Sequence, residues 1–275
     1  MSVICEYKAP DLFARYDIDE NPEAKYFGMH IHDQYEVYYL VSGEVNYLVE
    51  GHEYPLQPGM LMIMRPGESH AAKILKKKTY KRYYINFHAT LLDEIDPEYK
   101  LLRAFTDREL GCENLYSGAE FENIFPLTLF EAMHKEVGDE YQKRLNVRIY
   151  LLLLLEEINR IFDKRENIGY QTMETLPERM VAYVNAHLTE ELSVSSLADK
   201  FYLSTSQFSR VFKKATGASV WEYVIRKRLT MAKEAIRNGR CAKEASILCG
   251  FGDYSVFYRA YVKHFGCSPT EEKGT

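Results

Sequence analysis

The sequence predicts a multidomain α+β protein: an N-terminal β-barrel, a helical segment, and a C-terminal all-α domain of two helix-turn-helix units joined by a long helix. Three observations support this fold class. Short strand-like runs extend to about residue 90, and helical periodicity replaces them from about Asp96. A basic amphipathic segment, Phe208–Gly217, recurs 49 positions later as Phe257–Gly266. A repeat at fixed spacing indicates two copies of one structural unit.

The composition is that of a folded protein large enough for two hydrophobic cores. The chain has 275 residues, of which 46% are hydrophobic and 27% charged. We place the barrel at 1–95, the helical segment at 96–165, a linker at 166–175 and the C-terminal domain at 176–275. Five dispersed cysteines form no CxxC pair, which argues against a zinc knuckle or a disulfide framework. With no secretory signal and no bilayer-length apolar run, we expect a cytoplasmic protein without a membrane partner.

Charge is divided unevenly along the chain. The net charge is −5, but residues 170–275 hold 15 Lys and Arg against 11 Asp and Glu, and the remainder holds 20 against 29. A mildly basic C-terminal part attached to an acidic domain favours local attraction to phosphates.

The barrel is predicted from the runs Val37–Leu40, Val45–Val49 and Leu61–Met64, which lie between glycine-containing turns. Polar side chains gather around the first run, and alternate residues of a strand face the same interior. The candidates for a polar pocket at the barrel mouth are His30, His32, Glu36, Tyr38, Tyr47, Arg65 and His70.

The spacing of these residues resembles the cupin family. Its first motif is matched by His30, His32, Glu36 and Gly43. Its second motif is approximated, with altered spacing, by Gly59, Pro66, Gly67 and His70. Such a set either lines a pocket for a small polar ligand or holds a divalent transition metal. Because the second motif departs from the family pattern, we expect no cofactor, and a metal at His30, His32, Glu36 and His70 is the alternative.

The longest apolar helical segment runs from Arg144 to Phe162. Residues at spacings of three and four form one apolar face, and Leu152 and Leu153 extend it to a second. Such a helix is buried on several sides, either against its own barrel or between two chains. We favour a dimer seam, since a small barrel needs only one face covered.

Helix signals in the C-terminal domain occur in the order of two helix-turn-helix units. The first unit has a short helix at 194–201 and a second from about Thr205 to Ala215, capped by Ser204 and ended by Gly217. A connecting helix of about 19 residues, about 28 Å long, leads to the second copy at 242–248 and about 254–264. Successive major-groove faces of B-DNA lie about 34 Å apart. One chain could therefore place both basic helices in adjacent groove segments.

The second unit carries Ala245, Gly250-Phe251, Phe257, Arg259, Tyr261, Lys263, Gly266 and Ser268-Pro269. This pattern resembles the DNA-binding domain of the AraC/XylS family of transcription regulators. The resemblance implies base contacts from Ser206, Gln207, Ser209, Arg210, Tyr254, Ser255, Tyr258 and Arg259, the two arginines being typical partners of guanine. Phosphate contacts are expected from Lys213, Lys214, Arg226, Arg228 and Lys263.

Together the resemblances imply a ligand-responsive, sequence-specific transcription regulator, an activator and not an enzyme. Its expected partners are promoter DNA, a small-molecule effector such as a sugar, RNA polymerase and a second copy of the chain. The alternative is a metal-dependent cupin enzyme with a fused DNA-binding domain, which leaves the repeated basic helices unexplained.

Overall fold

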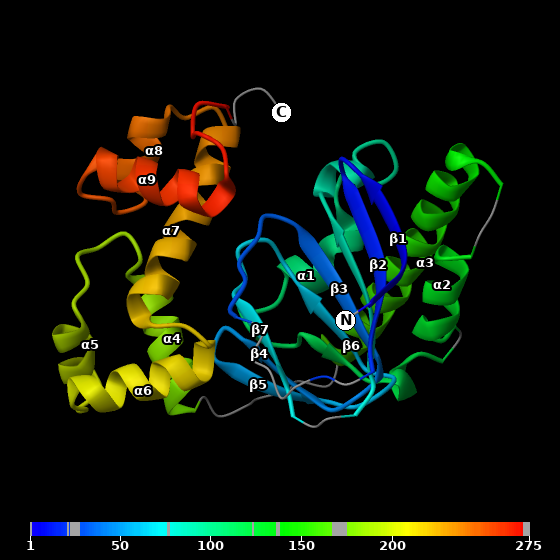
Figure 1. The fold of residues 1–275 in the computed structure, drawn as a ribbon, viewed down its shortest axis with the longest axis horizontal. Helices are drawn as coiled ribbons and strands as arrows, with labels where there is room; N and C mark the ends of the chain where they lie inside the picture. Colours follow the sequence, from blue (N-terminus) through cyan, green and yellow to red (C-terminus); the bar gives the residue numbers. More distant parts are fainter. Residues whose placement is uncertain are drawn as a thin grey trace.

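The computed structural model describes residues 2–20, 22, 28–75, 78–122, 124–135, 138–166 and 175–271. Most of the expected linker, 166–175, lies outside the described residues. The β-rich part and the helical C-terminal part lie beside each other, with the connecting helix α7 facing the barrel (Figure 1). No helix in the described ranges is long and apolar enough to cross a membrane.

The N-terminal domain contains two antiparallel sheets. The larger has the order β1-β2-β8-β3-β6-β9 and the smaller the order β5-β4-β7. Their strands are β1 (Ser2–Ala9), β2 (Leu12–Asp19), β3 (Tyr35–Ser42), β4 (Val45–Val49), β5 (His52–Leu56), β6 (Leu61–Met64), β7 (His70–Ile74), β8 (Tyr80–Phe87) and β9 (Leu115–Tyr116). The three strand runs expected from the sequence lie within β3, β4 and β6.

Alternation along β3 separates two cores, as its sequence pattern predicts. Val37 and Tyr39 belong to the core between the large sheet and the helical segment. Tyr38 and Leu40 belong to the core between the two sheets, where Tyr47 is also buried. Glu36 has the parity of Tyr38, so its carboxylate is directed toward the interior of the barrel and not toward the helices.

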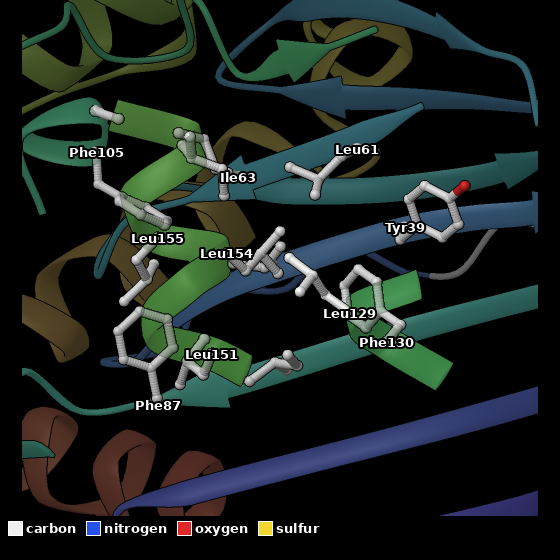
Figure 2. Packing of buried hydrophobic residues seen from close by; sticks show 14 of the residues in the cluster. Tyr39, Leu61, Ile63, Phe87, Phe105, Leu129, Phe130, Leu151, Leu154 and Leu155 are labelled. Carbon is white, nitrogen blue, oxygen red and sulfur yellow. The ribbon is translucent and has the colours of Figure 1, made fainter. Parts of the chain in front are cut away.

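The helical segment covers the outer face of the large sheet. It contains α1 (Arg103–Thr106), α2 (Pro126–Met133), α3 (Glu140–Glu166) and the 3-10 turns Ala89–Leu92, Lys100–Leu102 and Gly118–Glu120. Figure 2 shows Leu151, Leu154 and Leu155 of α3 packed on strand residues such as Ile63 and Phe87. The same helix exposes a second apolar row, Tyr141, Leu145, Ile149 and Leu153.

The C-terminal domain consists of α4 (Leu176–Ala186), α5 (Val194–Lys200), α6 (Thr205–Thr216), α7 (Val220–Arg237), α8 (Ala242–Leu248) and α9 (Tyr254–Phe265). Helices α5 and α6 form the first helix-turn-helix, and α8 and α9 the second. Gly217 and Gly266 end α6 and α9 in the left-handed conformation, with φ of 79° and 76°, which costs glycine little. The turn of the second unit is one residue longer, because α8 begins 48 positions after α5 and α9 begins 49 positions after α6.

Candidate functional site

The second helix of each unit is basic and exposed along one face. In α6, Phe208 and Phe212 are buried, and the predicted base-reading residues Ser206, Gln207, Ser209 and Arg210 are exposed. The amide oxygen of Gln207 accepts a hydrogen bond from the backbone N–H of Ser204 at 3.0 Å, so this side chain also closes the N-terminal cap. Lys213 and Lys214 are exposed in the last turn.

Helix α9 repeats this arrangement. Phe257 and Tyr261 are buried. The predicted base-reading residues Tyr254, Ser255, Tyr258 and Arg259 are exposed, as is the predicted phosphate contact Lys263. The carboxylate of Asp253 caps the helix by accepting the N–H of Val256 at 2.9 Å. Both helices therefore present one arginine and nearby hydroxyl groups to solvent at equivalent positions, a pattern suited to base edges and phosphates.

Two predicted phosphate contacts are engaged elsewhere. Arg228 is buried, and its guanidinium donates hydrogen bonds to three backbone carbonyls. The expectation of a phosphate contact from Arg228 is therefore wrong, because the side chain does not reach the surface. Arg226 is half-buried and bonds to Glu222 and to the carbonyl of Met29 in the N-terminal domain. Periodicity alone places both arginines on a charged helix and does not show what packs against them.

In the barrel, three of the predicted polar residues converge. His32 lies before β3, Glu36 on β3 and His70 at the start of β7, and ligand atoms from all three lie within 4.8 Å of one another. The Nε2 atoms of His32 and His70 lie 3.0 and 3.5 Å from the same carboxylate oxygen of Glu36. Asn86, which the sequence analysis did not select, donates to that oxygen at 3.1 Å. Its position on β8, beside Glu36, follows from strand register.

Backbone carbonyls fix the orientation of both imidazoles. Nδ1 of His32 donates to the carbonyl of Gln34, and Nδ1 of His70 to that of Glu68, each at 2.9 Å. Since carbonyls only accept, Nδ1 carries the hydrogen in both rings and both Nε2 atoms face Glu36. Either protons on Nε2 or a cation between the three groups can satisfy this arrangement.

The electrostatics of the cluster favour charged groups. Burial raises the pKa of Glu36, but hydrogen bonds and charges from His32 and His70 outweigh it and hold the pKa well below its ordinary value. Burial lowers the pKa of His70, but Glu36 reverses this and raises it. The cluster can therefore hold a negative and a positive charge in a buried place.

Of the other predicted pocket residues, one contacts the cluster and the rest have different surroundings. Tyr47 directs its hydroxyl to Glu36 at 3.4 Å and belongs to the site. Tyr38 packs on Tyr47, but its hydroxyl bonds to that of Tyr80 at 2.7 Å. His30 is exposed and is outside the three-residue cluster. Arg65 points away, because its guanidinium donates to the carbonyls of Thr106 and Arg108. The expectation that Arg65 lines the pocket is therefore wrong.

A buried polar cluster around Glu50 joins the two domains, and only a turn signal at Glu50-Gly51 marks this place in the sequence. Glu50 is buried and has a left-handed φ of 48°. Its carboxylate accepts hydrogen bonds from Lys227 and Tyr223 of α7, from Asn185 of α4 at 2.8 Å and from the backbone N–H of Ser69 at 2.5 Å. Burial with four donors and strain at one residue marks a specific docking contact.

Close backbone packing supports this docking. A Cβ atom at Gly51 would lie 2.9 Å from the side chain of Val181 on α4, so only glycine fits there. Beside it, Met29 and Ile31 belong to the core of the first helix-turn-helix unit. Asp33 pairs with Lys233 at 3.3 Å and with Arg237. Because Lys227 also donates to the carbonyl of Gly67 at 2.8 Å, the segments flanking both His32 and His70 contact α7 directly.

Comparison with known proteins agrees with this geometry. A barrel that carries a polar site, joined to a domain of two basic helix-turn-helix units, is the architecture of a DNA-binding transcription regulator with a ligand-binding domain. A family model described as an AraC-like ligand binding domain matches residues 14–153, and one described as a helix-turn-helix domain matches residues 197–273. The chain belongs to the AraC family, which confirms the predicted family and fold class.

Curated relatives are transcription regulators. The chain is 24% identical over 253 residues to the transcriptional activator RhaR of Mannheimia succiniciproducens, covering 89% of this chain and 86% of RhaR. It is 30% identical over 146 residues to the probable transcriptional regulator LumQ of Photobacterium leiognathi, covering 52% of this chain and just over half, 56%, of LumQ.

Among solved structures, fatty acid-bound ToxT from Vibrio cholerae aligns with a TM-score of 0.43 at 10% identity, covering 96% of this chain and 95% of ToxT.

Proposed function

We propose that the chain is a sequence-specific DNA-binding activator whose barrel binds a small polar effector such as a sugar. The observation that carries the DNA-binding half is the repeat of one exposed basic face on α6 and α9, with Arg210 and Arg259 at equivalent positions. Activation is supported by RhaR, which is described as an activator. The partners are promoter DNA, the effector and, as for any activator of initiation, RNA polymerase.

The function is tested by replacing Arg210 with alanine. If Arg210 reads a base edge, Arg210→Ala weakens specific binding by about 1–3 kcal/mol and relaxes preference at one base pair. The measurement is a binding assay on duplexes selected from a random pool, each base of the site being varied in turn. Lys213→Ala, one turn further along, serves as the comparison and should weaken all sequences alike. An equal loss for all sequences in Arg210→Ala would contradict base reading by this residue.

Coupling between effector and DNA is proposed to run through Glu50 and the loops beside it. Lys227 donates to Glu50 and also to the carbonyl of Gly67 at 2.8 Å. Gly67 in turn donates its N–H to the carbonyl of His32 at 2.9 Å. On the other side, the ring of Tyr223 packs edge-on against Phe212 of α6 at 5.3 Å. A ligand that moves the His32 and His70 loops therefore changes contacts that hold α7 and the base of a recognition helix.

A homodimer is proposed through α3. The exposed residues Tyr141, Leu145, Ile149 and Leu153 follow one another at intervals of four and form one apolar stripe. The opposite face of α3 already covers the sheet. Helix α3 therefore has one apolar face that packs on its own barrel and a second that is available for a dimer seam. A second copy, with the same stripe, is the partner that matches it.

A divalent metal in the barrel is the second candidate for the ligand, because both imidazoles direct Nε2 toward the Glu36 carboxylate. Two histidines and one carboxylate suit a transition metal, and the bonds from Nδ1 to carbonyls are the usual support for such ligands. When bound, the ion would supply a Lewis-acidic centre. The chain's own contribution is to orient His32, Glu36 and His70 around it.

The two candidates are separated by metal analysis of the purified full-length protein after incubation with Zn²⁺, Mn²⁺ or Fe²⁺. A metal site predicts one ion per chain and a raised melting temperature, both lost in His32→Ala and retained in His187→Ala, a control outside the cluster. Wild-type protein that retains no ion and shows no thermal shift would exclude these ions as ligands. It would also remove the basis for a metal-dependent enzyme.

A further inference from the structure

We propose that Arg228 is a positioning residue that fixes the two helix-turn-helix units relative to each other, and thereby sets the spacing of the DNA half-sites. The proposal rests on the DNA-binding function above and assigns to Arg228 a role other than phosphate contact. Arg228 lies in the middle of α7, the helix that connects the two units.

The guanidinium of Arg228 bridges both units through backbone carbonyls. Its Nε donates to Leu188 at 2.6 Å and one terminal nitrogen to Glu190 at 2.7 Å, both in the loop that leads from α4 into α5 of the first unit. The other terminal nitrogen donates to Gly250 at 2.5 Å, just beyond α8 in the second unit. Carbonyls near helix C-termini carry partial negative charge, so one buried cation stabilises two helix ends at once.

Three carbonyl acceptors take the place of a carboxylate partner for this buried arginine. Among the described residues, the hydrogen bonds of Arg228 all go to carbonyls. Burial lowers the pKa of Arg228, but an arginine remains protonated at neutral pH. The guanidinium reaches the three carbonyls with three different nitrogens held in one plane, whereas a lysine carries all its donors on one nitrogen at the end of a flexible stem.

The units also touch directly at this point. Gly250 has a φ of 82°, and a Cβ there would lie 2.9 Å from the carbonyl oxygen of Thr189 and 3.0 Å from Cζ of Arg228. The turn of the second unit therefore packs on the loop between α4 and α5, which leads into the first unit. Helix α7 sets the distance between the units, and this contact sets their rotation about the helix axis.

Rotation matters because DNA presents its grooves at fixed angles. One added base pair turns the next half-site by about 35°, so units held rigidly bind well at one spacing only. We expect the full-length wild-type chain to lose about tenfold or more in affinity when one base pair is inserted between its two half-sites, comparable to mismatching part of the site.

The test compares full-length wild type, Arg228→Lys and Arg240→Lys, the last an exposed arginine just beyond α7. Each is measured on duplexes selected by the wild type, on the same site with one base pair inserted or removed, and on a duplex with one half-site scrambled. On the duplex with one half-site scrambled, the affinity of Arg228→Lys should lie within about twofold of that of the wild type. On the complete site its affinity should be about tenfold lower, and inserting or removing one base pair should change that affinity much less than in the wild type. Arg240→Lys should match wild type throughout.

A second variant changes the same contact at Gly250, in the turn of the second unit. Gly250→Ala should relax the spacing preference in the same way, because its Cβ pushes the two units apart. Equal losses on the half-site and the complete site in both variants, or an unchanged spacing preference, would overturn the proposal. If the wild type selects no DNA at all, the proposed function fails and not the assignment of Arg228.

Discussion

Replacing Glu50 with glutamine should cost about 3–5 kcal/mol, because it leaves the buried ammonium of Lys227 without its counter-charge. The side chains of Glu50 and Lys227 are only 2% and 6% exposed, so water does not replace the lost partner. The amide of glutamine also turns one oxygen acceptor into a donor, facing the donors Tyr223 and Asn185. The lost free energy is that of the contact between the two domains, since the hydrophobic core of each domain is unchanged.

The expected result is a separation of two unfolding transitions in urea. Trp221, the only tryptophan in the sequence, lies at the start of α7 and reports the C-terminal domain. The near-ultraviolet circular dichroism of the tyrosine-rich barrel reports the other domain. In the wild type the two probes should give one midpoint, and in Glu50→Gln two.

Two further variants make the prediction specific. Adding Lys227→Met to Glu50→Gln should recover part of the loss, since no buried charge is left unpaired. Lys164→Met removes a lysine whose partner Glu122 is 2.8 Å away but exposed, and should leave both urea midpoints unchanged, because water screens this pair. Coincident transitions in Glu50→Gln would show that this carboxylate does not hold the domains together.

The helix-turn-helix units could be predicted from local sequence, whereas the contact between Glu50 and Lys227 could not. Caps, stops and apolar periodicity act within one or two helical turns, so α8 and both recognition helices lie within a residue or two of where the pattern placed them. The pairing of His32 with Glu36 is also local, four residues apart on and before one strand.

Long-range contacts account for what the sequence did not reveal. Glu50 meets Lys227 across 177 positions and Tyr223 across 173, and a turn pattern at Glu50-Gly51 carries no trace of either partner. Arg65 and Arg228 fail as predicted contacts for the same reason. Arg65 follows a predicted strand and Arg228 lies on a charged helix, and both donate to backbone carbonyls brought near by the fold. Charge and periodicity identify a cation; only packing shows whether it is free to bind a ligand.

Glu68→Gln should be as costly as Glu50→Gln, about 3–5 kcal/mol, but it should weaken the barrel itself. Glu68 and Arg108 are a fully buried pair with both side chains at 0% exposure, joined by two hydrogen bonds of 2.8 and 2.7 Å. The carboxylate also accepts the backbone N–H of Gly111 at 2.8 Å and the amide of Asn114 at 3.0 Å. Removing its charge leaves Arg108 buried and unpaired.

The matched control is Glu120→Gln, because Glu120 also binds an arginine, Arg165, through two hydrogen bonds of 2.8 Å, but at a partly exposed site. Glutamine keeps its role at the helix cap, so the expected change is about 0–1 kcal/mol. Urea denaturation of both variants measures the difference, and similar midpoints would contradict a special role for the buried pair.

Glu68 lies between Gly67, which accepts from Lys227, and His70 of the barrel site. Glu68→Gln should therefore also reduce any ligand-induced shift in DNA affinity. The loop that connects the barrel site to α7 would no longer be held by the ion pair with Arg108.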